Sequence, residues 1–274
     1  SRFGSVRHVQ VSSFAEKLCQ EYNNIVIRYL AGKLARTSDD HAVLAKSTES
    51  TDDRIANEML NRALNLTEPK MFFAKTEQLR CKLRSAALNN MACLHSSCNR
   101  PKLALKALWE ARVLSWNGQK YALSSKRQKE MSTSEVRTVL NMSSLYNKQG
   151  EYEKALKLLT NACISLRKRT ILYAKGNETS KAGESQSNEL LPLTLYSLGC
   201  THEHLCQWKD ACQCFSEASG HAKRLFGPQH LMVQQCKEAH EDAMVRNEVQ
   251  MRERKKRNAR MARSHRNRTN GFQF

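Results

Sequence analysis

The chain has 274 residues but only ten glycines and four prolines. A β-sandwich or barrel needs a turn roughly every 8–12 residues, and a phosphate-binding loop needs clustered glycines, so this composition excludes both and favours long helices. The formal net charge of +19 would attract acidic surfaces such as nucleic acid, anionic lipid or acidic protein.

Neither a membrane span nor a secretory signal is visible in the sequence. No apolar run approaches the ~18 residues that a span requires, and the first residues lack a basic stretch followed by an apolar one. We therefore expect a soluble intracellular protein with no membrane span. Most of the ten cysteines fall in helical stretches beside apolar residues, where we expect reduced thiols.

Self-similar segments dominate the middle of the chain. Residues 140–162 predict two short helices joined by a turn at Gly150 and Tyr152. One face of the first helix carries Met142, Ser143 and Tyr146, and one face of the second carries Ala155, Leu159 and Ala162. Small residues let two such helices approach, while larger ones fill the space between successive pairs. The segment closely resembles a tetratricopeptide repeat.

Further copies of this pattern lie on both sides. One contains Gly199 as a close-contact residue, and another has Pro101 where the repeat normally has an aromatic turn residue. The second helices of the copies share a face that carries Ala56, Leu60 and Ala63; Ala104, Leu108 and Ala111; and Ala211, Phe215 and Ala218. Residues 218–233 resemble the connector between the longer repeats of kinesin light chains.

Spacing between the copies exceeds that of a plain repeat. The equivalent residues Ala56, Ala104, Ala155 and Ala211 lie 48, 51 and 56 residues apart, against about 34 for the family. We therefore expect expanded loops near residues 118–134 and 175–188. The predicted fold is all-α, a tetratricopeptide-like solenoid of helical hairpins with a long basic C-terminal helix.

Four regions follow from this pattern. Residues 1–84 form an N-terminal helical region with a divergent hairpin, and residues 85–230 hold three repeats with expanded loops. Residues 231–245 form a helix that caps the last repeat, because an array must cover its exposed apolar end. Residues 246–274 form a basic tail.

The tail concentrates positive charge. Between positions 246 and 268 the chain has ten Lys or Arg against two Glu, a net charge of +8. The residues that we expect to bind an acidic partner are Arg252, Arg254, Lys255, Lys256, Arg257, Arg260, Arg263, Arg266 and Arg268. No aromatic residue precedes Phe272 here, so stacking on bases is disfavoured and any nucleic acid would be bound through its phosphates. A nuclear import signal and a merely solvated helix remain alternatives.

The resemblance also implies a peptide groove. In the family, the first helices of successive repeats line a concave surface that receives an extended peptide. The match places Asn89, Asn90, Arg137, Asn141, Lys148, Tyr196 and His204 there. Asn90 and Asn141 occupy equivalent positions, and an amide both donates and accepts hydrogen bonds. The alternative is that these are ordinary polar residues on an exposed face.

Patterns typical of metal binding and of catalysis fit the sequence less well than the repeat does. His202 and Cys206 are one helical turn apart, near Cys200, Cys212 and Cys214, which invites a zinc site. The repeat distributes these residues over two helices and a turn, so they would not converge, and we expect no metal and no cofactor. No Ser or Cys nucleophile with a positioned His and acid stands out, so we expect no enzyme activity.

The sequence favours a non-catalytic scaffold or adaptor within a large assembly. Its partners would be proteins and an acidic surface, not a small-molecule substrate. Tubulin, in a microtubule or axoneme, is the favoured surface, which implies a place in the cytoplasm or cytoskeleton, including a cilium or flagellum. The alternatives are an RNA-contacting subunit of a ribonucleoprotein or ribosome-associated complex, and a peptide-binding cargo adaptor.

Overall fold

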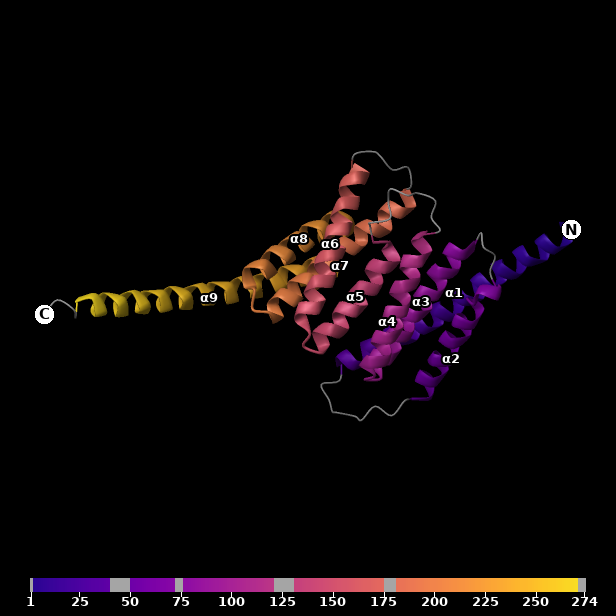
Figure 1. The fold of residues 1–274 in the computed structure, drawn as a ribbon, viewed down its shortest axis with the longest axis horizontal. Coiled ribbons are helices and arrows are strands. Elements are labelled where there is room, and N and C mark those ends of the chain that lie inside the picture. The colour runs from indigo at the N-terminus through magenta and orange to yellow at the C-terminus, as the bar shows by residue number, and fades with distance from the viewer. Residues whose placement is uncertain (1, 40–49, 72–75, 121–130, 175–180, 271–274) are drawn as a thin grey trace. The chain divides into compact units, whose positions relative to one another are not determined.

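The computed structural model describes the backbone of residues 2–39, 50–71, 76–120, 131–174 and 181–270. Within these ranges it describes the side chains of residues 13–33, 50–70, 76–116, 131–171 and 189–261. These parts of the chain form helices and no strand, which confirms the all-α class (Figure 1). In chain order they are α1 (Arg2–Asp39), α2 (Thr51–Leu66), a 3-10 turn η1 (Pro69–Met71), α3 (Glu77–Ser97), α4 (Pro101–Lys120), α5 (Thr133–Lys148), α6 (Tyr152–Ala174), α7 (Lys181–His204), α8 (Trp208–Phe226) and α9 (Leu231–Asn270).

Contacts within the chain divide it into two compact units, Ser1–Leu158 and Leu159–Phe274. The division falls inside α6. Unit 1 therefore holds α1 to α5 and the start of α6, and unit 2 holds the rest of α6 with α7, α8 and α9.

In unit 1, α1 packs on α2 and α3 packs on α4, while α3 also contacts α1 and α5. The turn between α3 and α4 is short because Asn99 takes a positive φ of 55°, and Pro101 then starts α4. Proline suits the first position of a helix, where its missing N–H has no partner to lose. A similar turn separates α5 from α6, with Gly150 at φ 76°.

The faces predicted for the second helices are buried. Each face carries a larger residue with one alanine before it and one alanine after it. The triplets are Ala56, Leu60 and Ala63 in α2; Ala104, Leu108 and Ala111 in α4; Ala155, Leu159 and Ala162 in α6; and Ala211, Phe215 and Ala218 in α8. All twelve are at most 4% exposed, which confirms the helical period read from the sequence.

A buried carboxylate joins α1 to α2. Asp53 accepts hydrogen bonds from Lys33 Nζ at 2.7 Å and from Tyr29 Oη at 2.8 Å, and it completes a capping box with Ser50 at the start of α2. Burial by itself would raise the pKa of Asp53, but the bonds from Lys33, Tyr29 and Ser50 outweigh it and lower that pKa to about 2.

Two arginines of α3 cover the other end of α2. Arg80 Nη1 donates to the carbonyl of Thr67 at 3.0 Å, and Arg84 Nη1 donates to the carbonyl of Leu64 at 2.9 Å. The last carbonyls of a helix lack partners within it and carry partial negative charge, so cations there stabilise the helix end. These bonds fix α2 against α3.

In unit 2, α8 lies between its partners, packing on both α7 and α9. The predicted close contact at Gly199 is present: a Cβ at this position would lie 2.6 Å from the ring of Phe215, which is fully buried. The loops expected near residues 118–134 and 175–188 were too long. Residues 118–120 belong to α4, residues 133–134 belong to α5, and residues 181–188 form the first two turns of α7. Residues 121–130 and 175–180, also expected in loops, lie outside the described part of the chain.

Candidate binding surfaces

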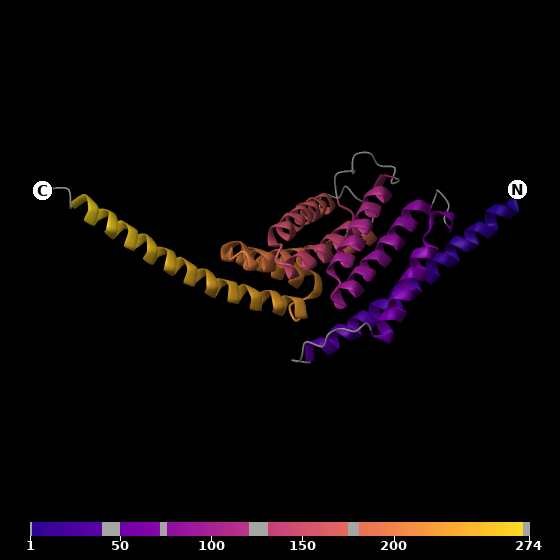
Figure 2. The same cartoon turned by 60° about the horizontal axis from the view of Figure 1, so that its bottom comes forward.

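The predicted cap and the predicted basic tail form one continuous helix, α9 (Figures 1 and 2). Val233, Cys236 and Ala243 are buried, and Ala243 packs with Ala211 and Phe215 of α8. The packing continues past position 245, where the sequence placed the end of the cap. The guanidinium carbon of Arg246 lies 5.1 Å from the centroid of the Trp208 ring, and Gln250 Nε2 donates to the carbonyl of Cys206 at 3.3 Å.

Beyond Gln250, every side chain described, through Met261, is exposed. This stretch holds six of the predicted partner-binding cations, namely Arg252, Arg254, Lys255, Lys256, Arg257 and Arg260. At about 100° per residue they point to most sides of the helix. Arg252 pairs with Glu248 at 3.5 Å, and the other five have no ion pair within the described residues. Arg263, Arg266 and Arg268 belong to α9, but their side chains lie outside the described part.

The rest of unit 2 is electrically neutral. Residues 159–245 carry nine Lys or Arg and nine Asp or Glu, whereas residues 246–268 carry the net +8. A generally basic surface would spread its charge over the whole unit. Here the charge is confined to residues 246–268 of α9, most of which lie beyond the contacts of Arg246 and Gln250.

A row of amides crosses unit 1. Asn90 Nδ2 of α3 donates to Asn23 Oδ1 of α1 at 2.7 Å, and Asn141 Nδ2 of α5 donates to Asn89 Oδ1 of α3 at 2.9 Å. Asn89 Nδ2 in turn donates to the hydroxyl of Thr138 in α5 at 2.9 Å. The structure thus brings together the three predicted asparagines, and uses their amides to join neighbouring helices.

Asn23 and Thr138 belong to this row but were not predicted as site residues. The signal for Asn23 was present, because the pair Asn23 and Asn24 repeats the pair Asn89 and Asn90. It was hidden by the 67 residues that separate Asn23 from its partner Asn90.

The other predicted groove residues have different surroundings. Arg137 and Lys148 are exposed and lie on the same face of α5 as Asn141, because they are four and seven residues away from it. Tyr196 and His204 belong to unit 2. Tyr196 packs against the buried cluster of Phe215 and Ala243, with its ring centroid 5.5 Å from that of Phe215, and burial raises its pKa to about 12. His204 is exposed at the end of α7.

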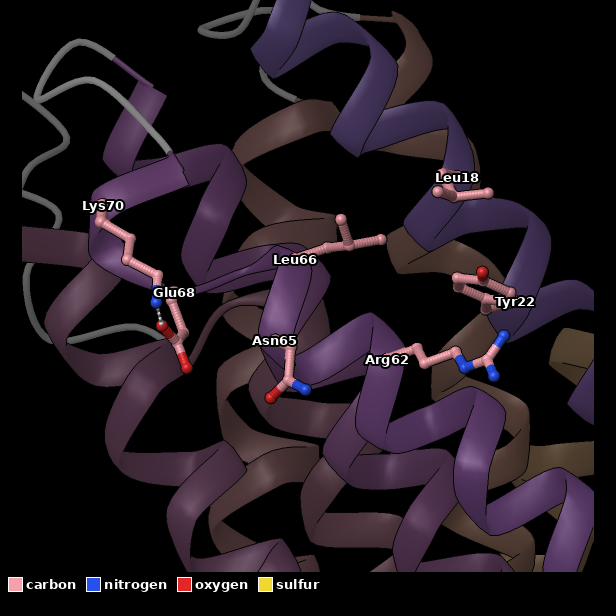
Figure 3. Close-up of a pocket in the computed structure, with 7 residues that line it drawn as sticks. All are labelled: Leu18, Tyr22, Arg62, Asn65, Leu66, Glu68 and Lys70. Carbon is pink, nitrogen blue, oxygen red and sulfur yellow. Dashed lines mark ion pairs between the residues drawn. The ribbon is translucent and has the colours of Figure 1, made fainter.

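A pocket of about 480 Å³ lies between α1 and α2, close to η1 (Figure 3). It is lined by Leu18, Tyr22, Arg62, Asn65, Leu66, Glu68 and Lys70. Its charges are satisfied by ion pairs, because Lys70 contacts Glu68 at 2.8 Å and Arg62 contacts Glu58 at 2.5 Å. Small-molecule sites are mostly apolar and enclosed, with a few polar groups that converge on the ligand, so this pocket lacks their character.

The cysteines that suggested a zinc site form no disulfide with one another. Cys200, Cys206, Cys212 and Cys214 are free, and burial raises the pKa of Cys200 to about 11 and that of Cys214 to about 12. Zinc needs thiolate or imidazole ligands at tetrahedral positions. Among the residues whose placement is described, no group of three or more His, Cys, Asp or Glu could hold a metal ion.

None of the described helices contains an apolar stretch long enough to cross a membrane. Comparison with known proteins adds no family. No protein-family model matches the sequence, and no curated protein matches it.

Proposed function

We propose that the protein is a non-catalytic scaffold that attaches to an acidic surface of a large assembly through the basic part of α9. The observation that carries this proposal is the separation of charge in unit 2: a neutral helical body bears a +8 segment whose described cations are all exposed. A charge of this density in so short a segment favours association with an extended anion. From Gln250 to Asn270 the helix could reach about 30 Å.

The helices of both units, apart from the basic part of α9, are proposed to form a tetratricopeptide-type solenoid. The support is the set of buried Ala and larger residues at equivalent places in α2, α4, α6 and α8, together with the close contact of Gly199 with Phe215. Such arrays present extended surfaces and hold a terminal element rigidly, since each repeat packs on its neighbours.

Microtubules are the favoured acidic surface, which places the protein on the cytoskeleton, including a cilium or flagellum. The described part of the basic segment has cations on most sides and no aromatic side chain, which suits a repeating acidic protein lattice better than the stacking and edge contacts by which single-stranded RNA is read. RNA phosphates would attract the same cations, so an RNA-contacting role is the second candidate. The peptide-adaptor role has less support, because Asn89, Asn90 and Asn141 bond to other helices.

The test compares two variants with equal loss of charge. In the tail variant, Arg252, Arg254, Lys255, Lys256, Arg257 and Arg260 are all changed to Gln. In the dispersed variant, six exposed cations outside the basic segment, Lys17, Arg28, Arg54, Lys82, Lys209 and Lys237, are changed to Gln. Substitution is preferable to truncation after Val245, because truncation would also remove the contacts of Arg246 and Gln250.

Co-sedimentation of the full chain with polymerised microtubules, and separately with a structured RNA, is measured at low and moderate salt. We expect the wild type and the dispersed variant to bind microtubules, and the tail variant to bind at least about tenfold more weakly, with affinity falling as salt rises. Binding to RNA alone, lost in the tail variant, would replace the cytoskeletal role with the ribonucleoprotein one. Binding to neither, or equal loss in both variants, would overturn the proposal.

A further inference from the structure

Helix α4 is apolar on two opposite sides. Its core side carries Ala104, Ala107, Leu108 and Ala111, all of which are buried. The opposite side carries Trp109, Val113 and Trp116, which are 48%, 55% and 53% exposed. A helix normally shows one apolar stripe toward its core and polar residues elsewhere, and a helix that is apolar on both sides is typically covered on both. Two half-exposed tryptophans on one face are therefore unusual for a free surface.

The Trp109 ring on this outer face is held in place by a neighbouring side chain of α4. The guanidinium of Arg112 lies 5.5 Å from the centroid of the Trp109 ring, and its Nε is 3.5 Å from Glu135 Oε1. Glu135 is itself buried at the start of α5, where its N–H bonds to the capping Ser132. Arg112 thus fixes the Trp109 ring in its exposed position, and an ordered aromatic group loses little entropy when a partner covers it.

Spacing and charge define what this face would fit. Trp109, Val113 and Trp116 follow at i, i+4 and i+7, a straight ridge of about 10 Å that matches two turns of a facing helix. Lys102 and Lys106 continue the same stripe toward the start of α4, and both are exposed. No acidic group within the described residues forms an ion pair with either lysine. The face is therefore an apolar ridge with a positively charged end.

We propose that the outer face of α4, formed by Lys102, Lys106, Trp109, Val113 and Trp116, is a docking site for an acidic amphipathic helix of a partner protein. Apolar residues of that helix would pack against the tryptophan ridge, and its carboxylates would pair with the two lysines. Tryptophans of this kind contribute much of the binding energy in protein interfaces, and complementary charge sets partner choice. This site is in unit 1 and does not depend on the role of α9.

A helix fits better than a nucleic acid. Base stacking needs an open aromatic face, and one face of Trp109 is covered by the guanidinium of Arg112. An extended peptide would contact a helical ridge at only one or two points, because its side chains repeat every ~7 Å and do not follow the i, i+4, i+7 stripe.

The probe is a synthetic helix of about 20 residues with leucines on one face and glutamates elsewhere. Two control peptides keep its length: one scrambles the same composition, and one replaces Glu with Lys. Binding to the full chain is followed by the anisotropy of a dye on the peptide and by tryptophan emission. We expect the amphipathic acidic helix to bind more tightly than the scrambled one and to shift the emission to shorter wavelength. The tail attracts both acidic peptides equally, so their difference reports on the apolar ridge.

Three variants locate the binding. Trp109→Ala with Trp116→Ala should weaken binding about tenfold or more, while Ile164→Ala with Ile171→Ala, an exposed pair with the same seven-residue spacing in α6, should leave it unchanged. Lys102→Glu with Lys106→Glu should weaken the acidic helix and strengthen the Lys-substituted one. Far-UV circular dichroism checks that each variant is folded. Three results would overturn the proposal. The scrambled and amphipathic peptides could bind equally well, or the isoleucine variant could lose as much binding as the tryptophan variant. The third result is that single-stranded RNA binds through the two tryptophans and the acidic helix does not.

Discussion

Gly199 sets how closely α7 approaches α8. Changing it to Ala would bring a Cβ to 2.6 Å from the fully buried ring of Phe215, so either the ring or the helix must move. We expect Gly199→Ala to lower the free energy of unfolding by about 1–3 kcal/mol, as for other overpacked cores. Urea denaturation followed by circular dichroism measures the change.

Gly220 provides the matched control in α8. A Cβ there would meet nothing within 4 Å, and the residue is exposed in a helix interior. Gly220→Ala should therefore stabilise the protein by about 0.5–1 kcal/mol. If both substitutions changed the free energy of unfolding in the same direction, the close contact would not be the cause.

Asp53 predicts a pH dependence for the α1–α2 pair. Its pKa is about 2 in the folded protein, below the ordinary value of 3.8, so its contribution is complete above about pH 4 and is lost as pH falls toward 2. We expect Asp53→Asn to cost about 2 kcal/mol at neutral pH, and the difference from wild type to shrink at acid pH. Unfolding curves at pH 7, 4 and about 2.5 check this. The exposed neighbour change Asp52→Asn, which leaves the bonds from Lys33 and Tyr29 to Asp53 intact, should cost less at neutral pH.

Residues on a helical face were the most predictable part of the molecule. The triplet of Ala104, Leu108 and Ala111 was identified from local spacing alone, because the period of a helix determines which residues share a side. The partners of Asn23 and Asp53 were not identified. A hydrogen bond between helices depends on their relative axial position, which local spacing does not reveal.

At the scale of helices, the amide row predicts energetic coupling between α3 and α5. Asn141 donates to Asn89, so removing either side chain should already remove their bond. In a double-mutant cycle with Asn89→Ala and Asn141→Ala, we expect a coupling free energy of about 0.5–1.5 kcal/mol. The pair Asn24→Ala and Asn141→Ala, in which Asn24 is exposed, should be additive. An additive result for the first pair would mean that the row does not join the helices.

The ends of helices were less predictable than their existence. The Ser-, Gly- and Lys-containing stretch before Asn188 indicated a loop, yet residues 181–188 belong to α7. The change at Arg246 from apolar to basic residues indicated a boundary, yet α9 continues and still packs there through Arg246 and Gln250. Composition indicates which part of a helix packs against its neighbours. It does not indicate where the helix ends, because a helix can continue for several turns beyond its last packing contact.

For the whole molecule, where charge lies matters more than its total. The tail variant and the dispersed variant defined above each lose six positive charges, but only the tail variant loses them from the segment where charge is concentrated. On a cation exchanger, we expect the tail variant to elute at clearly lower salt than the dispersed one, because clustered charges act together on a charged surface. Elution at the same salt would show that only net charge matters.

Positively charged side chains repel one another within the basic part of α9. Arg252, Lys256 and Arg260 follow one another at i, i+4, where like charges repel and weaken a helix, and no core contact supports the chain there. An anion that settles among these side chains removes the repulsion that works against the helix. Binding of an acidic partner would therefore strengthen the helix that these residues already form, and raise the temperature at which this segment loses its helical structure.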